Sequence, residues 1–245
     1  MRYRAIAALV KLGLEKFIRQ PAYLFLNLLF PAVLTIVFLF AFADPEMGMD
    51  INSVVPGLIV YAVIFLIMTI AQSFSSERQQ GLLKRLNTTP MTSAEFMGSQ
   101  IITHMLISIV QVVVVITLAY LLGFKPNSGI EGILLALPVV AIFALSSVGL
   151  GLITATVSKT PEVATGLSFI FILPMMFFGT FIPITSTTRQ IANFIPSHYL
   201  VNALKMIFEG NWMNTNIILD LIVISTVSIL VVVVGIMLFE KYGSS

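Results

Sequence analysis

The chain has 245 residues, of which 58% are hydrophobic and only 10% are charged. A soluble domain carries about 25% charged residues, so this composition excludes a soluble protein and indicates an integral membrane protein. The absence of cysteine excludes disulfides and thiolate metal sites, and a net charge of +2 is too small to suggest a nucleic-acid partner.

Residues 2–20 are expected to form an amphipathic helix. Apolar residues recur at steps of three and four, and charged residues fall on the other side: Tyr3, Ile6, Val10, Leu14 and Phe17 against Arg4, Lys11, Glu15 and Arg19. A helix of this kind lies in the membrane interface. The alternative is a soluble helix packed on a domain, but no soluble domain follows. Pro21 then breaks the helix.

Six apolar runs reach the length of about 20 residues that a membrane-spanning helix needs. They are Ala22–Ala43, Val54–Ser75, Phe96–Leu122, Gly132–Val157, Val163–Pro183 and Ile217–Phe239. Their interiors lack Asp, Glu, Lys and Arg, and Asp220 sits near the start of the last run. We therefore expect an all-α integral membrane protein in which residues 1–245 form one transmembrane domain.

The orientation follows from the distribution of Lys and Arg, which favour cytoplasmic segments. If the N-terminus is inside, ten of the 13 lie in inner segments, and only Lys125, Arg189 and Lys205 lie outside. Both termini and residues 76–95 are then cytoplasmic, and the protein is a multi-pass protein of the cell's inner, cytoplasmic membrane.

Residues 184–216 are too long for a turn and too apolar for a solvated loop. A helix could begin at Pro196 and Ser197 and end at Gly210. Its apolar face would hold Leu200, Ala203, Leu204, Ile207 and Phe208, and its polar face Asn202, Lys205 and Glu209. We expect a re-entrant or interfacial outer helix that packs over the mouth of the bundle before the last span.

Residues 76–95 form a polar segment between two spans. Ser76 and Gln79 have capping-box spacing, which predicts a helix that begins there and stops at Thr89 and Pro90. Such a helix is a short stiff rod on the inner surface, hinged at both ends, that a partner could push. The alternative is an inert basic loop, which the inside-positive rule alone would produce.

These segments carry a resemblance to a known family. Glu77-Arg78-x-x-Gly81, followed by Leu83-x-x-Leu86-x-x-Thr89-Pro90, resembles the cytoplasmic segment of type-2 ATP-binding-cassette (ABC) exporter permeases. Pro183, Pro196, Tyr199 and Asn202-Ala203-Leu204-Lys205 resemble the family's pattern before its last span. The order of the elements also matches over essentially the whole chain. Leu82 departs from the family, which often has Thr there.

The resemblance implies a homodimer or heterodimer of permeases above two ABC ATPase subunits. Its coupling helix would dock on the ATPase through Glu77, Arg78, Gly81, Leu83, Thr89 and Pro90. Gly81 would allow close backbone approach, and the Glu and Arg would make charge-assisted contacts. The chain lacks the G-x-x-x-x-G-K-[ST] loop that cradles phosphates, so it is no enzyme, and ATP and Mg²⁺ belong to the partner.

The stretch from Phe169 to Pro183 is rich in Phe and Met, which make adaptable apolar walls. Pro174, Gly179 and Pro183 would kink or loosen this span. We assign a transport pathway to Phe171, Met175, Phe178 and Phe181. The alternative is that these residues face lipid or another span.

Three polar or small-residue features lie inside or beside the spans. His104 and Gln111 share one face of the third span, where they line a polar track, relay a proton or bond neighbouring helices. His198, beside Tyr199, is expected to be structural, and neither His has partners for a metal site. Ser147, Gly151 and Ala155 recur at four-residue steps and predict a close helix–helix seam.

We expect an ATP-driven exporter of hydrophobic or amphipathic cargo, a drug-like molecule or lipid, because the predicted pathway carries no charge. Export of a polysaccharide, peptide or ion by a permease of the same family is an alternative. An ATP-independent secondary transporter or channel would need intramembrane charge to bind ions. A membrane enzyme or scaffold is less favoured still, since no catalytic constellation is evident.

Overall fold

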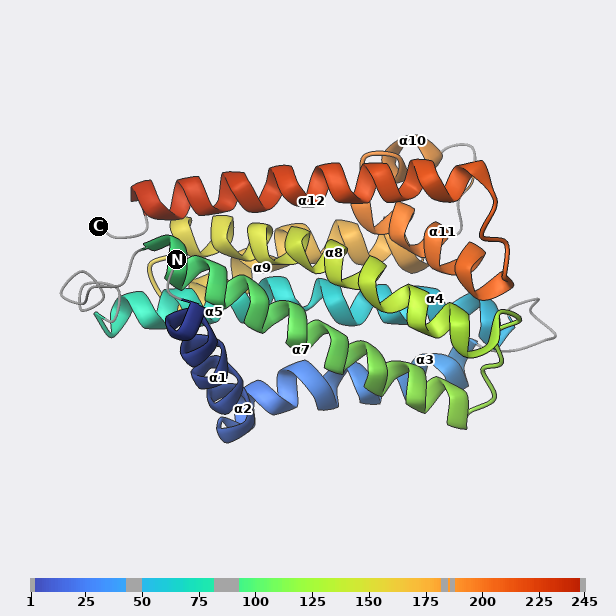
Figure 1. The fold of residues 1–245 in the computed structure, drawn as a ribbon, viewed down its shortest axis with the longest axis horizontal. Helices are drawn as coiled ribbons and strands as arrows, with labels where there is room; N and C mark the ends of the chain where they lie inside the picture. Colours follow the sequence, from blue (N-terminus) through green and yellow to red (C-terminus); the bar gives the residue numbers. More distant parts are fainter. Residues whose placement is uncertain (1–2, 43–49, 82–92, 182–184, 186–187, 243–245) are drawn as a thin grey trace.

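The computed structural model describes residues 3–42, 50–81, 93–181, 185 and 188–242, and every regular element in them is a helix. The long helices lie side by side in an elongated bundle (Figure 1). The N-terminal part runs α1 (Tyr3–Arg19), α2 (Pro21–Leu24), the π-helix η1 (Phe25–Leu29) and α3 (Phe30–Phe42). Next come α4 (Ile51–Ile64), α5 (Leu66–Gln79), α7 (Ser93–Leu121) and α8 (Gly129–Val157). The rest is α9 (Pro161–Met176), the π-helix η3 (Phe177–Phe181), α10 (Arg189–Ala192), α11 (Pro196–Glu209) and α12 (Thr215–Tyr242).

Five helical segments of the described chain are long and apolar enough to cross a membrane. They are Ile51–Gln79, Glu95–Leu121, Gly129–Val157, Pro161–Thr180 and Thr215–Phe239, and they cover the second to sixth expected spans. The first expected span, Ala22–Ala43, is divided among α2, η1 and α3, and its apolar helical part, Asn27–Ala41, is shorter. The count of six spans therefore stays a prediction.

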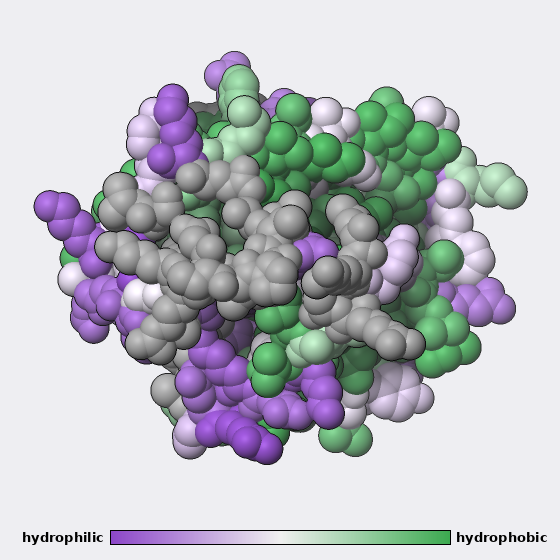
Figure 2. Space-filling model, turned by 60° about the vertical axis from the view of Figure 1, so that its left-hand side comes forward, coloured by the Kyte–Doolittle hydropathy of each residue, from purple (hydrophilic) through white to green (hydrophobic). Residues whose placement is uncertain are grey.

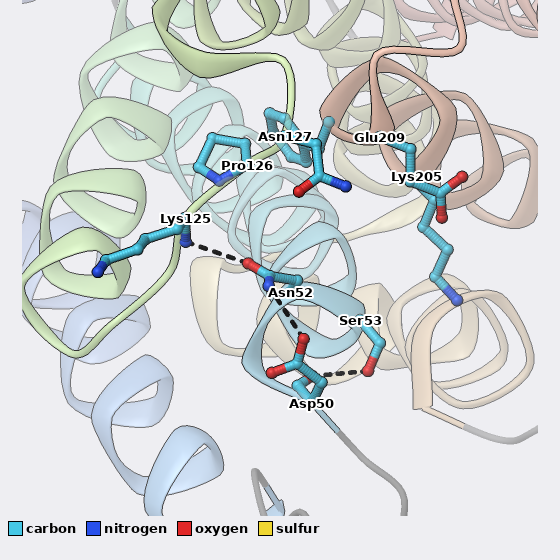
Figure 3. A pocket seen from close by; sticks show the side chains of 9 residues that line it. Asp50, Asn52, Ser53, Lys125, Pro126, Asn127, Lys205 and Glu209 are labelled. Atoms are coloured by element: carbon cyan, nitrogen blue, oxygen red, sulfur yellow. Dashed lines mark hydrogen bonds between the residues drawn. The ribbon is translucent and has the colours of Figure 1, made fainter.

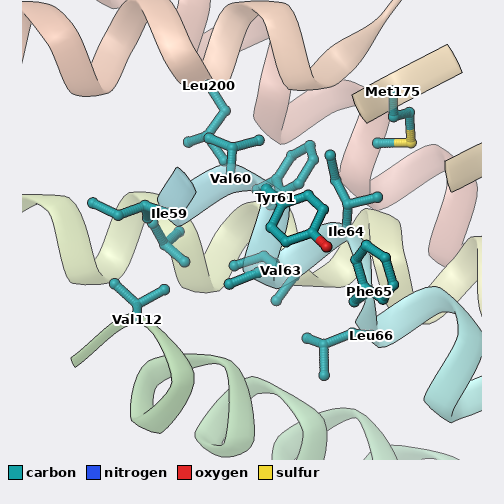
Figure 4. Packing of buried hydrophobic residues seen from close by; sticks show 14 of the residues in the cluster. Ile59, Val60, Tyr61, Val63, Ile64, Phe65, Leu66, Val112, Met175 and Leu200 are labelled. Carbon is teal, nitrogen blue, oxygen red and sulfur yellow. The ribbon is translucent and has the colours of Figure 1, made fainter. Parts of the chain in front are cut away.

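Helices α4 and α5 form the centre of the bundle. Of the most apolar 18 residues of Ile51–Gln79, 94% are buried, against 22% for the corresponding window in α12. Figure 4 shows the packing here, where Val60 lies beside Leu200 of α11 and Ile64 beside Met175 of α9. Burial from all sides explains why this run has no polar stripe until its last two turns.

Helix α8 packs through small residues on two faces. Ser147 Oγ donates to the Val63 carbonyl at 3.0 Å, and a Cβ on Gly151 would lie 2.7 Å from Ile70 Cβ. The predicted seam is therefore confirmed at Ser147 and Gly151, with α4 and α5 as its partners, and Ala155 is buried. On the other face, a Cβ on Gly149 would lie 2.5 Å from the Val231 backbone of α12. Small side chains allow these helix backbones to approach closely.

Helix α1 crosses the bundle at one end and packs on α7 (Figure 1). Ile6, Val10 and Leu14 are partly buried and Phe17 is buried, whereas Tyr3 is exposed. Lys11 and Glu15 pair at 3.9 Å across one turn. The position of α1 at a membrane interface stays a prediction.

Candidate functional site

The end of α5 carries the first residues of the predicted coupling segment. The prediction of a helix that begins at Ser76 is wrong, because α5 runs without a break from Leu66 to Gln79 and includes that residue. The amide of Gln80 bonds the Ser76 carbonyl at 3.0 Å and closes the last turn. A capping pattern has no effect where the preceding turn already supplies the backbone partners. Leu83, Thr89 and Pro90 lie outside the described residues.

Gly81 ends α5 in the left-handed conformation, with φ of +68°. Its amide bonds the Arg78 carbonyl at 3.0 Å. No described atom lies within 4 Å of the place where a Cβ would stand, so packing inside the chain does not require glycine here. The positive φ is the reason for glycine at this position, because a positive φ is costly for a residue with a side chain. Close approach to a partner at Gly81 stays a prediction.

Glu77 points into the bundle. Its side chain is 9% exposed, and its Oε1 lies 2.9 Å from Lys16 Nζ of α1. Ser73 Oγ lies 3.3 Å from both groups and joins them. Glu77 Oε2 is buried without a hydrogen-bond partner in the described part of the chain. The carboxylate thus ties α5 to α1, and its predicted contact with an ATPase stays untested.

A small cavity of about 30 Å³ adjoins this pair. Its walls come from α1, α5 and α7 and include Thr69, Thr103 and His104 beside the pair itself. A polar cavity of this size has room for a water molecule, which needs two or more polar partners. Such a water would give the second oxygen of Glu77 a donor.

Arg78 and Gln79 point the other way, toward the turn between α8 and α9. Arg78 Nη1 donates to the Thr156 carbonyl and Gln79 Nε2 to the Lys159 carbonyl, each at 3.4 Å. Thr156 lies in the last turn of α8, where unpaired carbonyls give the helix end a partial negative charge. The end of α5 is therefore held between α1 and the turn that begins α9.

Basic residues gather at this end of the bundle. The last turn of α1 holds Lys16 and Arg19, the last turn of α5 holds Arg78, and the last turn of α12 holds Lys241. Figure 2 brings this end forward and shows hydrophilic surface gathered beside the residues drawn in grey. The expected grouping of inner positive charge is thus present at one end of the molecule.

Sequence reasoning missed a buried polar contact around Asn27 in η1. Gln111 Nε2 donates to the Asn27 carbonyl at 2.7 Å, and Thr69 Oγ1 to Asn27 Oδ1 at 3.0 Å. Pro31 stands four residues on and has no N–H, so it cannot donate to this carbonyl as a residue in an α-helix normally would. An amide in an apolar run four residues before a proline was the signal that could have found it.

The two polar residues predicted on α7 have different partners. Gln111 bonds η1, which confirms the expected contact with a neighbouring helix. His104 Nδ1 lies 2.8 Å from the Gln100 carbonyl of its own helix, and the ring borders the small cavity. Within the described chain, no three His, Cys, Asp or Glu side chains gather where they could hold a metal ion.

The predicted pathway residues occupy different environments. Met175 is buried in the core, whereas Phe171 and Phe178 are partly buried and pack against it. The helix changes to the π form at Phe177, three residues after Pro174, as expected of a loosened span. A Cβ on Gly179 would collide with Ser197 of α11. The side chain of Phe181 lies outside the description, and the pathway role of all four stays a prediction.

The helix predicted to begin at Pro196 forms, and its outer position stays a prediction. Helix α11 runs from Pro196 to Glu209 and is capped by Gly210, which has φ of +79°. All five residues expected on its apolar face are buried, and Lys205 and Glu209 are exposed. Tyr199 Oη donates to the Asn193 carbonyl at 2.8 Å, and Asn202 Nδ2 lies 3.1 Å from His198 Nε2. Burial, with smaller effects from Lys205 and Arg189, lowers the pKa of His198.

A polar pocket of about 480 Å³ opens at this end of the molecule (Figure 3). Its walls are the start of α4, the turn after α7 and the end of α11. Asn52 organises it, because its Nδ2 donates to Asp50 and its Oδ1 accepts from the Lys125 amide at 3.1 Å. Lys205 and Glu209 add one charge of each sign.

Comparison with known proteins gives two matches. The family described as ABC-2 type transporter matches residues 4–208. The daunorubicin resistance ABC transporter permease protein DrrB1 of Streptomyces coeruleorubidus is similar over 187 residues, at 24% identity. That alignment covers 75% of this chain and 66% of the relative, so it spans slightly less than two thirds of the relative's length.

Proposed function

The chain belongs to the ABC-2 type transporter family, and on this premise we propose that it is the permease subunit of an ATP-driven exporter. The family match across residues 4–208 carries the proposal. ATP hydrolysis takes place on a separate subunit, because this chain lacks a phosphate-binding loop. The assembly contains two permease copies and two ATPase subunits in the cell membrane.

The proposed topology has six spans and both termini in the cytoplasm. The gathering of Lys16, Arg78 and Lys241 at one end of the bundle supports it, because inner segments are enriched in Lys and Arg. The first span would combine α2, η1 and α3, which follow one another directly from Pro21 to Phe42.

In the proposed mechanism, ATP closes the partner subunits and displaces residues 76–90. Helix α5 transmits the displacement, because it is central and its end is tied to α1 by Glu77 and to the α8–α9 turn by Arg78. The bundle then changes from inward-facing to outward-facing, and cargo leaves under α11.

The proposed cargo is a hydrophobic or amphipathic molecule, drug-like or lipid. The similar permease from Streptomyces coeruleorubidus is named for daunorubicin resistance, which supports a drug-like cargo. The apolar surroundings of Phe171, Met175 and Phe178 support the same class. Export of a polysaccharide, peptide or ion by a permease of this family is the alternative.

Single-cysteine chemistry tests the topology and the partner, since the chain has no cysteine of its own. Gln80→Cys places a probe at the exposed end of α5, and Lys205→Cys places a matched probe on α11. In intact cells, a membrane-impermeant maleimide should label only position 205. A maleimide–benzophenone cross-linker should join only position 80 to an ATP-hydrolysing subunit. Labelling of position 80 from outside the cell would refute the proposal.

Transport measurements test the coupling role of Arg78. In inverted membrane vesicles that contain the complete transporter, Arg78→Ala should reduce uptake of a fluorescent anthracycline per ATP hydrolysed. Arg189→Ala, at the other end of the bundle, is the matched control and should leave this ratio unchanged. If the two variants contain equal amounts of folded protein and show the same uptake per ATP hydrolysed, the coupling role of Arg78 is contradicted.

A further inference from the structure

A groove of about 510 Å³ lies between the second half of α7 and the first turns of α8. This volume falls within the range of about 300–1,000 Å³ that is typical of small-ligand sites. Its walls are mainly aliphatic and come from α7 and α8: Val113, Ile116, Thr117, Leu121, Ile130 and Ile133. Tyr120, Lys125 and Pro126 complete it at the end of the bundle where α7 turns into α8.

The groove is open on the outer side of the bundle. Tyr120, Leu121 and Ile130 are 61%, 76% and 67% exposed. Large apolar side chains at such exposure, on helices able to cross a membrane, indicate a surface that faces lipid chains or another apolar partner. A hollow in this surface therefore takes an elongated apolar group.

Tyr120 and Lys125 lie toward one end of the groove. Tyr120 is at the end of α7, and tyrosine is enriched at the level of lipid headgroups. Lys125 follows in the turn, and no Asp or Glu is among the residues that line the groove. In Figure 3 the Lys125 side chain extends away from Asp50 and Glu209 of the polar pocket. Lys125 is exposed in the turn that lines the groove, so its ammonium group can reach the head of the apolar groove.

We propose that this groove binds one anionic phospholipid, with an acyl chain between α7 and α8 and its phosphate at Lys125. A cation above an aliphatic hollow complements an anionic head joined to an apolar chain. A second copy of this chain fits less well, because a contact of the groove with itself would offer Lys125 no carboxylate from the lining. The proposal does not depend on ATP coupling or on the cargo.

Fluorescence quenching by brominated phospholipids tests the site in the full chain. A Tyr120→Trp substitution in a Trp212→Phe background places one reporter at the groove. The chain is reconstituted in mixtures of phosphatidylcholine and phosphatidylglycerol, with bromine on the chains of one lipid or the other. The reporter should show about fivefold preference for phosphatidylglycerol, the effect expected of one lysine beside an anionic head.

Three controls locate the preference. Lys125→Gln should reduce it to about one, whereas Lys205→Gln, which removes a cation at the same end of the bundle but outside the groove, should leave it unchanged. A reporter at Leu219, exposed near the start of α12, should show no preference. Preference that survives Lys125→Gln, or that is equal at Leu219, would mean a general surface charge effect and overturn the site. Failure of every lipid to quench the reporter at position 120 would mean that protein covers the groove.

Native mass spectrometry of chains without the reporter gives an independent measurement if the tryptophan variants do not fold. The unmodified chain and the Lys205→Gln variant should retain phosphatidylglycerol over phosphatidylcholine. The Lys125→Gln variant should retain phosphatidylglycerol and phosphatidylcholine equally. The same retention in all three proteins would overturn the proposal.

Discussion

The two faces of α5 are held in different ways. Toward α8, Gly151 brings the helices close at the Ile67 carbonyl and the Ile70 side chain. Toward α1, the contact is polar, runs through Ser73 and Glu77, and borders a cavity large enough for a water molecule. Close packing has one good arrangement, whereas an ion pair beside water can lengthen and re-form. We therefore expect α5 and α8 to move as one body and α1 to shift against them.

The largest effect should come from filling the packed face. Gly151→Val would place its Cβ 2.7 Å from Ile70 Cβ and 2.9 Å from the Ile67 carbonyl. Overpacking against a backbone costs about 1–3 kcal/mol, and we expect the upper part of this range. Thermal unfolding of the purified chain in mild detergent measures the loss.

Gly166→Val is the matched control for this substitution. Gly166 is exposed on α9, and no described atom lies within 4 Å of its Cβ position. Its unfolding temperature should stay close to that of the unmodified chain. An equal loss in both variants would mean that valine in a helix, and not the α5–α8 contact, causes the effect.

A smaller loss should follow from breaking the polar face. Lys16→Met leaves the Glu77 carboxylate buried without its cation and should cost about 1–3 kcal/mol. The double variant Lys16→Met/Glu77→Gln should recover part of this loss, because no buried charge remains unpaired. Lys11→Met removes only an exposed contact at 3.9 Å and should change stability by less than about 0.5 kcal/mol. No recovery in the double variant would contradict the pairing.

The loss at the end of α5 should be smaller still. Gly81→Ala forces a side chain into φ of +68° and should cost about 1 kcal/mol. Gly98→Ala is the control, since Gly98 lies within α7 with space around it and alanine favours helices. Hydrogen exchange of the amides near Gln80 should quicken only in the first variant. An unchanged exchange rate of these amides in Gly81→Ala would contradict the proposed backbone strain at position 81.

The smallest effect concerns α11, whose packed side includes a titratable group. Burial lowers the pKa of His198 from its ordinary value of 6.5. Near that pH, His198 therefore binds a proton less readily in the folded chain than in the unfolded chain. Stability should therefore fall as the pH drops below about 6.5 and should be unaffected above it. Unfolding temperatures between pH 7.5 and 5.5 measure this, and His198→Gln should flatten the profile. An unchanged profile in that variant would assign the dependence to another group.

Local patterns predicted α11 and most helix positions, because Pro196, Gly210 and the spacing of Leu200, Leu204 and Ile207 are signals within one segment. The start expected at Ser76 failed because a local capping pattern competes with a helix that packing on α8 and α9 already holds. Lys16 and Glu77 are 61 residues apart, and their pairing depends on which helices become neighbours. No spacing rule within a segment contains that information.

Pro31 has no N–H to donate to the Asn27 carbonyl four residues before it, and the amide of Gln111 from another helix donates to this carbonyl. Positions 31 and 111 should therefore be inherited as a pair. In a relative whose residue 31 has a backbone N–H, that N–H can compete for the carbonyl, and leucine or valine becomes more acceptable at position 111. A family alignment should show the two columns varying together, although 80 positions separate them along the chain.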